Sequence, residues 1–421
     1  MLIETIFELD TICRNYKIKN IPQFWFETWN KSMSSYKENR NWFLQLDYFK
    51  SANQILKLAD NAVHALEDST FIISSNDGLS MLAWHCYCLL FNEQDTPGSF
   101  NFNFPEFEEQ IGDIGDLFAA VVLIFGLNNT IKLHEIRGIP TYITVDTLSD
   151  LKLWMEHYKD KYGKWGLKES NWLINHFKGR LYRLGRLQFL PGSFNDNIKV
   201  FCNIYNGKII ALSEEGIRYR ADGQVDGTND IYDADHYWIS EIIISEKNIE
   251  GNFIDPNGIA VRDKTIFPVN EWELVLSKGD SVIEIHIPAG SKLDHKLCGE
   301  SISISKDFFL KHFPAKQYSV YTCNTWLFDS NFQKILPSSS NIVEFQCEFY
   351  LYPILSNDNA VFQRIFGDKP SDLSKASRST TLQNAVIEYY LAGNHLHDAG
   401  GFIMKADLNW GKDKLLYRRY I

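Results

Sequence analysis

The sequence lacks the short motifs by which many metal-binding and nucleotide-binding proteins are recognised. Its seven cysteines are scattered and form no Cys-x-x-Cys pair, which argues against a zinc ribbon and a dithiol redox motif. Neither a Walker A motif nor a Gly-x-Gly-x-x-Gly motif is present. We therefore expect reduced, mostly buried thiols and no metal site.

Positive charge and long apolar runs are also scarce. The chain has 42 Lys and Arg against 53 Asp and Glu, a formal net charge of −11, and an acidic surface repels nucleic-acid phosphates. The longest apolar run, residues 117–127, is too short to span a bilayer. The first residues carry acidic side chains where a signal peptide is basic. We expect a cytoplasmic protein with no membrane span and no nucleic-acid partner.

The 421 residues allow two or three domains, and the patterns divide near residue 180. Apolar residues at three-to-four spacing predict helices over 79–90, 105–127 and 147–163, the last capped by Thr147 or Ser149. Residues 1–180 are therefore predicted to form a helical domain.

Residues 181–421 carry strand and turn patterns instead. Asn206-Gly207 lies between two apolar segments and predicts a hairpin, the start of an antiparallel meander over 199–245. Strands and helices then alternate over 281–405. The expected strands are 281–288, 317–323, 341–354 and 400–405, and the expected helices are 292–313, 325–336 and 380–393. This order predicts an α+β domain with a mixed sheet.

The segment SVIEIHIPAGS, residues 281–291, combines a strand pattern with polar chemistry. Side chains alternate across a strand, so Glu284 and His286 share one face while isoleucines fill the other. The following helix offers unpaired backbone N–H groups, which suit an anion such as phosphate. Ser291 and Asp294 have the spacing of a capping box at its start.

Several stretches resemble a family of bacterial acyltransferase-like proteins. They include IEIHIPAG, TCNTWLFD, NIVEFQCEFYLYP and LAGNHLHDAGGFI, and also KWGLKESNWLINH in the first half. In that family a helical N-acyltransferase N-terminal domain precedes a GNAT-like C-terminal domain. The resemblance covers most of the chain.

The GNAT resemblance implies a mixed sheet in which two central strands splay apart to admit the pantetheine arm of an acyl-CoA. The pyrophosphate then rests on backbone amides at the start of the following helix. Residues 281–288 and 317–323 resemble the splayed strands, and the implied cofactor-binding residues are Ile287, Ala289, Gly290 and Ser291. The usual Gln/Arg-x-x-Gly-x-Gly/Ala loop is replaced here by PAGSKLDHKL.

The implied reaction is direct acyl transfer from acyl-CoA to a small amine. His286 is the expected general base because its ordinary pKa lies near neutrality, and Glu284 is its expected orienting partner. Tyr321 is a candidate proton donor to the leaving thiolate. Cys323 is a candidate nucleophile if it faces His286.

Further residues are assigned to the substrate cleft, and two alternatives stay open. The cleft residues are Trp326, His395 and His397. One alternative is a binding module with a GNAT-like cleft that has lost coenzyme A binding. The other is a hydrolase that uses Cys323 or a carboxylate pair of Glu344 and Glu348 on one strand face. The sequence leaves the amine, the acyl chain length and the oligomeric state open.

Overall fold

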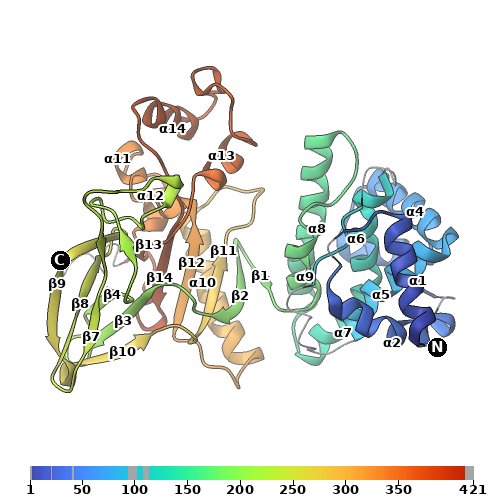
Figure 1. Cartoon of the computed structure of the whole chain (residues 1–421), viewed down its shortest axis with the longest axis horizontal. Helices are drawn as coiled ribbons and strands as arrows, with labels where there is room; N and C mark the ends of the chain where they lie inside the picture. The colour runs from blue at the N-terminus through green and yellow to red at the C-terminus, as the bar shows by residue number, and fades with distance from the viewer. Residues whose placement is uncertain (1, 20, 40–41, 93–101, 108–112, 413–421) are drawn as a thin grey trace. The chain divides into compact units, whose positions relative to one another are not determined.

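The computed structural model divides the chain into two compact units (Figure 1). The first comprises Met1–Leu184 together with Pro288–Ser291, and the second comprises Gly185–Ile287 together with Lys292–Ile421. The short segment after the strand that carries Glu284 therefore groups with the helical unit. The structure describes residues 2–19, 21–39, 42–92, 102–107 and 113–412.

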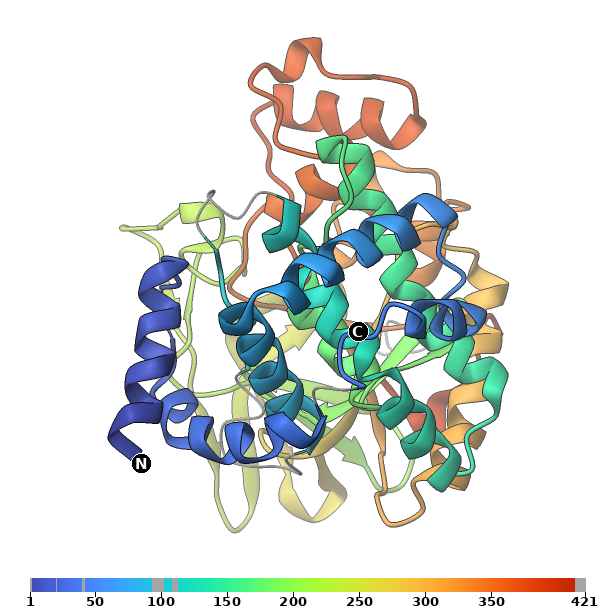
Figure 2. The same ribbon diagram turned by 90° about the vertical axis from the view of Figure 1, so that its right-hand side faces the viewer.

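The first unit is built from helices (Figure 2). They are α1 (Leu2–Asn15), α2 (Gln23–Asn39), α3 (Tyr48–Leu56), α4 (Asp60–Ser75), α5 (Asp77–Tyr87) with a π-helical extension (Cys88–Asn92), α6 (Asp113–Phe125), α7 (Leu127–Ile136), α8 (Thr141–Tyr162) and α9 (Ser170–Phe177). A short strand, β1 (Tyr182–Leu184), ends the unit. The predicted helical character of this half is confirmed.

Helix α6 forms the centre of this unit because it is apolar on every side. Its residues from Leu117 to Phe125 are all buried. The stretch Ile114–Ile136, which spans α6 and α7, is long and apolar enough to cross a membrane by length and composition alone. Of the most apolar 18 residues in this stretch, 67% are buried inside the protein, as in a core helix of a folded domain. The predicted start at residue 105 lies partly outside the described residues.

Helix α8 begins earlier than the sequence pattern predicted. Pro140 occupies its N-cap position, and Gly163 ends it with a φ of 72°, in the left-handed region. Thr147 and Ser149, the predicted caps, lie inside the helix. The hydroxyl of Thr147 instead accepts a hydrogen bond from the backbone N–H of Arg183 at 3.0 Å.

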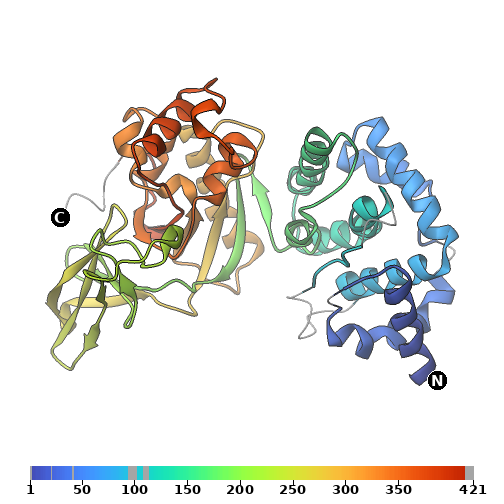
Figure 3. The same cartoon turned by 45° about the horizontal axis from the view of Figure 1, so that its top comes forward.

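The second unit mixes strands and helices (Figures 1 and 3). Its strands are β2 (Leu187–Ser193), β3 (Ile198–Asn203), β4 (Ile209–Ser213), β5 (Arg218–Tyr219), β6 (Trp238–Ile239), β7 (Ile242–Ile244), β8 (Asn248–Asp255), β9 (Ile259–Pro268), β10 (Trp272–Leu276), β11 (Ser281–His286), β12 (Val320–Thr325), β13 (Tyr350–Pro353) and β14 (Ala399–Met404). Its α-helices are α10 (His295–His312), α11 (Phe332–Ile335), α12 (Asn341–Gln346), α13 (Asn359–Phe366) and α14 (Thr381–Leu391). The predicted α+β class is confirmed.

The central sheet of this unit has the strand order β2-β11-β12-β14-β13. Strands β11 and β12 are parallel and are joined through α10, whereas the other neighbours are antiparallel. A second sheet has the order β10-β3-β4-β8-β7, with β9 paired to β8. The predicted hairpin is its β3–β4 pair, and Gly207 takes a φ of 71° in the connecting turn.

Two local predictions for the C-terminal third are wrong and one is confirmed. Residues 341–354 are not one strand, because Ser340 caps helix α12 through the N–H of Val343 and only Tyr350–Pro353 are extended. Residues 325–336 form a 3₁₀ turn and the short helix α11. Helix α14 has the expected capping box, in which Thr380 and Gln383 bond reciprocally.

Candidate active site

Strands β11 and β12 share a ladder for only two residue pairs. Ile283 pairs with Tyr321, and Glu284 pairs with Thr322. Both strands continue further, but β11 then bonds only to β2 and β12 only to β14. The two parallel strands therefore diverge after Glu284, as the resemblance to the GNAT-like family implies.

Glu284 and His286 lie together where the strands diverge. His286 Nε2 is 3.5 Å from Glu284 Oε2, and both side chains are about one-third exposed, at 31% and 38%. The carboxylate packs against Gly192 of β2, where a Cβ atom would lie 2.4 Å from Glu284 Oε1. A glycine at this position therefore leaves room for the carboxylate beside the imidazole.

Tyr321 and Cys323 lie on the opposite face of the sheet. Their register places them with Ile283, and the Tyr321 hydroxyl is 3.0 Å from Ser305 Oγ on helix α10. This corrects the hypothesis that Cys323 faces His286. Neither Tyr321 nor Cys323 shares a face with the Glu284–His286 pair.

Cys323 is also electrostatically unsuited to be a nucleophile. Burial raises the pKa of its thiol far above the ordinary value, and the nearby Glu284 carboxylate raises that pKa further. We expect iodoacetamide to leave Cys323 unmodified in the native protein at pH 8 and to modify it in urea, while the less buried Cys347 reacts earlier. Peptide mass mapping measures both, and fast native labelling of Cys323 would contradict the assignment.

The sequence did not point to three further polar residues on the face that carries Glu284. Asp196 Oδ2 accepts hydrogen bonds from the Tyr352 hydroxyl at 2.6 Å and from Asn324 Nδ2 at 3.1 Å. Tyr352 is fully buried, whereas Asn324 is exposed. The three residues come from three separate segments, so no local spacing relates them.

The N-terminus of α10 is capped by the chain itself. Asp294 Oδ1 accepts the N–H of Leu297 at 2.9 Å, and Ser291 takes no part in that cap, which corrects the predicted capping box. His295 Nε2 is 2.7 Å from Glu348 Oε1. Because Glu348 is buried against His295 and Glu344 lies on helix α12, the hypothetical carboxylate pair on one strand does not exist.

The four residues assigned to the cofactor lie in the turn between β11 and α10. Ala289, Gly290 and Ser291 are exposed, and Ile287 is partly buried. Gly290 takes a φ of 95°, and a Cβ atom there would lie 3.2 Å from Leu153. The three exposed residues of this turn are accessible to solvent.

Two of the three residues assigned to the substrate cleft contact C-terminal helices. Trp326 packs edge-on against Phe332, and the exposed His395 packs against Tyr390. His397 is buried, and its Nε2 lies 3.7 Å from Asp329 Oδ2. These contacts associate Trp326 with α11 and His395 with α14, whereas His397 contacts the loop residue Asp329.

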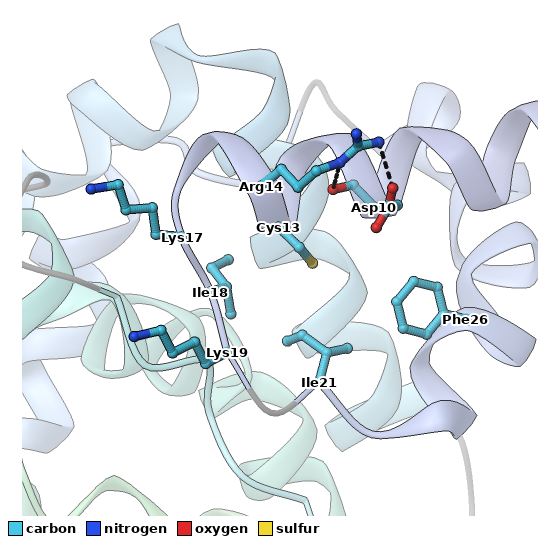
Figure 4. A pocket seen from close by; sticks show the side chains of 8 residues that line it. All are labelled: Asp10, Cys13, Arg14, Lys17, Ile18, Lys19, Ile21 and Phe26. Atoms are coloured by element: carbon cyan, nitrogen blue, oxygen red, sulfur yellow. Dashed lines mark hydrogen bonds and ion pairs between the residues drawn. The ribbon is translucent and has the colours of Figure 1, made fainter.

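The described residues contain no group of three or more His, Cys, Asp or Glu side chains arranged to hold a metal ion. They do contain a pocket of about 430 Å³ between α1 and α2, lined by Cys13, Ile18, Ile21 and Phe26 with basic residues nearby (Figure 4). The salt bridge of Arg14 with Asp10 borders this pocket. It holds none of the residues predicted to be functional.

Both halves of the chain match models of known protein families. The model of the GNAT-like C-terminal domain matches residues 181–403, more than half of the sequence. The protein belongs to the GNAT-like C-terminal domain family. The N-acyltransferase N-terminal domain matches residues 49–179 of this GNAT-like protein, so the resemblance seen in its sequence is confirmed for both halves.

Solved structures share the fold of this GNAT-like protein. A mutant acyltransferase in complex with octanoyl-CoA is 16% identical, with a TM-score of 0.64 over 94% of this chain and 99% of that one. An acyltransferase in complex with decanoyl-CoA and teicoplanin is 18% identical, with a TM-score of 0.59 over 84% and 87% of the two chains. A search of curated proteins gave no match.

Proposed function

We propose that this GNAT-like protein transfers an acyl group from an acyl-CoA to an amine. The observation that carries the proposal is the divergence of β11 and β12 after the Glu284–Thr322 pair. Beyond that pair, the backbone groups of β11 and β12 do not form a ladder with each other. The Glu284–His286 pair, which is able to move a proton, lies at the same place. Proteins of the same fold have been crystallised with octanoyl-CoA and with decanoyl-CoA, which supports a thioester as the donor.

In the proposed reaction the amine nitrogen attacks the thioester carbonyl carbon. His286 takes the proton that the nitrogen loses, and Glu284, 3.5 Å away, stabilises the imidazolium that forms. The carbon–sulfur bond breaks, an amide is released, and coenzyme A leaves as a thiolate that takes up a proton. Backbone N–H groups of Ala289–Ser291 contribute to binding the cofactor.

Thermal unfolding with coenzyme A, acetyl-CoA, octanoyl-CoA and decanoyl-CoA tests the proposal. A ligand at a hundred times its Kd stabilises the native state by about 2.7 kcal/mol. For a chain of this size we expect Tm to rise by a few degrees, with a larger rise for longer acyl chains. A well-folded sample whose Tm is unchanged by all four compounds would refute the acyltransferase proposal.

Asp294 provides a more specific test of where the pyrophosphate binds. An α-helix leaves its first N–H groups without intrahelical partners, and Asp294 places a negative charge at that end of α10. Asp294→Asn keeps a capping oxygen and removes the charge, so we expect coenzyme A to bind about two- to fivefold more tightly. Calorimetric titration measures this, with Asp235→Asn as an exposed control. Unchanged affinity would place the pyrophosphate elsewhere.

The same carboxylate favours a second candidate function. A GNAT-like cleft with Asp294 at the helix N-terminus and a single glycine in the preceding turn suits a binding module that does not use coenzyme A. The thermal unfolding experiment separates the two proposals, because a binding module gives no shift with any thioester.

A further inference from the structure

The face of the central sheet that carries Glu284 has a carboxylate on each side of the point where β11 and β12 diverge. Glu284 and His286 lie on β11, while Asn324 lies on β12 two residues beyond the last shared pair (Figure 1). If the strands stayed paired, Asn324 would be the partner of His286. Asp196 accepts the Asn324 side-chain N–H at 3.1 Å, which adds a carboxylate on that side.

Tyr352 fixes the position of this second carboxylate. Its hydroxyl donates to Asp196 at 2.6 Å and also lies 3.3 Å from Asn324 Oδ1. The tyrosine ring reaches Asn324 across β14 at Gly400, where a Cβ atom would lie 2.1 Å from the ring. Because Tyr352 is fully buried, the orientation of the Asp196 carboxylate is set by the interior of the domain.

On this face, the described strands of the second unit offer no opposing positive charge. The strand residues on it, all within the described part of the chain, are Gln188, Leu190, Gly192, Val282, Glu284, His286, Val320, Thr322, Asn324, Tyr350, Tyr352, Gly400, Phe402 and Met404. None is a lysine or an arginine. The carboxylates of Glu284 and Asp196 therefore attract a bound cation and repel a bound anion.

We propose that Asp196, oriented by Tyr352 and Asn324, binds the acceptor as an ammonium ion opposite Glu284 and His286. This inference rests on the proposed acyltransferase function and names its acceptor class: amines without a neighbouring carboxylate. Asp196 is a positioning residue that holds the ammonium ion. The bound ammonium ion first loses one proton through His286 to solvent, which gives the neutral amine that attacks the thioester. His286 then takes the second proton that the nitrogen loses, and the thiolate of coenzyme A takes up a proton as it leaves. An α-amino acid is disfavoured because its carboxylate approaches two negative side chains.

The test compares tyramine with tyrosine as acceptors, using octanoyl-CoA as donor, and repeats the comparison with octylamine and 2-aminononanoate. We expect kcat/KM for each amine to exceed that for its carboxylated partner at least tenfold. Asp196→Asn is expected to raise KM for the amines about ten- to a hundredfold, since a hydrogen bond to a charged group is lost, with a smaller effect on kcat. Tyr352→Phe keeps the carboxylate and is expected to raise KM less.

The controls separate this inference from the acyltransferase proposal. Asp235→Asn, an exposed carboxylate elsewhere, is expected to leave KM unchanged, and Asp196→Glu is expected to restore part of the affinity. If octanoyl-CoA binds but Asp196→Asn leaves KM for the amines within twofold, the inference is overturned and the transferase stands. The inference is also overturned if octanoyl-CoA binds and no amine reacts, or if the carboxylated acceptors react equally well. If octanoyl-CoA does not bind at all, the acyltransferase proposal and this inference fail together.

Discussion

His286→Gln is expected to lower kcat for acyl transfer by about 10²- to 10⁴-fold while leaving acyl-CoA affinity nearly unchanged. General base catalysis contributes a factor of this size, and glutamine has a similar reach but takes no proton at neutral pH. The imidazole lies at the divergence of β11 and β12, with Glu284 3.5 Å away. Single-turnover rates with saturating octanoyl-CoA measure the chemical step separately from donor binding.

Gly192→Ala provides a matched variant that retains both His286 and Glu284. The added methyl group would lie 2.4 Å from Glu284 Oε1, so the carboxylate must move. We expect kcat to fall as it does in Glu284→Gln, because each change removes the oriented carboxylate beside the imidazole. If His286→Gln retains wild-type kcat, the base is another group. If the kcat values of Gly192→Ala and Glu284→Gln differ by more than tenfold, the position of the Glu284 carboxylate beside the imidazole is not what supports catalysis.

The helical unit is expected to lose about 4 kcal/mol of stability between pH 8 and pH 5 through two buried histidines. Burial lowers the pKa of His85 to about 3, and burial together with Arg137 lowers the pKa of His134 to about 4, against an ordinary value of 6.5. Between the folded and unfolded pKa values the unfolded chain binds more protons. Stability is therefore complete above pH 6.5 and falls as the pH decreases.

Urea unfolding followed by far-UV circular dichroism at several pH values measures this loss. His85→Asn keeps a polar atom near Ser32, whose hydroxyl lies 2.8 Å from His85 Nδ1, and is expected to remove about 2 kcal/mol of the loss between pH 8 and pH 5. His64→Gln, at an exposed position, is the control that retains the full pH dependence. An unchanged pH dependence in His85→Asn would show that His85 is not the group that titrates.

The parts of the fold that sequence reasoning found are those that local signals determine. The Thr380–Gln383 capping box and the alternation of Glu284 with isoleucines each act within a few residues, and the structure contains both features. The prediction of one strand over 341–354 was wrong because Val343 and Phe345 alternate with polar residues, as they would in a strand. There, the cap at Ser340 and the burial of Phe345 select a helix, which alternation alone does not reveal.

The candidate site was only half predictable for a related reason. Glu284 and His286 were found because they lie on one strand. Asp196, Asn324 and Tyr352 meet only after three segments are brought together by the sheet. A glycine in strand β14, Gly400, was the one signal in the sequence, since a glycine inside a strand often marks a close approach of another group.

The short ladder between β11 and β12 also affects the mechanics of the second unit. Within the second unit, the central sheet consists of two hydrogen-bonded ribbons, β2–β11 and β12–β14–β13. They are joined by two residue pairs, which lie in the middle of β11 and near the start of β12. Beyond these pairs no ladder of described residues joins the two ribbons, so we expect the gap between them to adjust its width more easily than a fully paired sheet would allow. Amide hydrogen exchange along β11 and β12 should accordingly be slow near Ile283 and fast near His286 and Asn324.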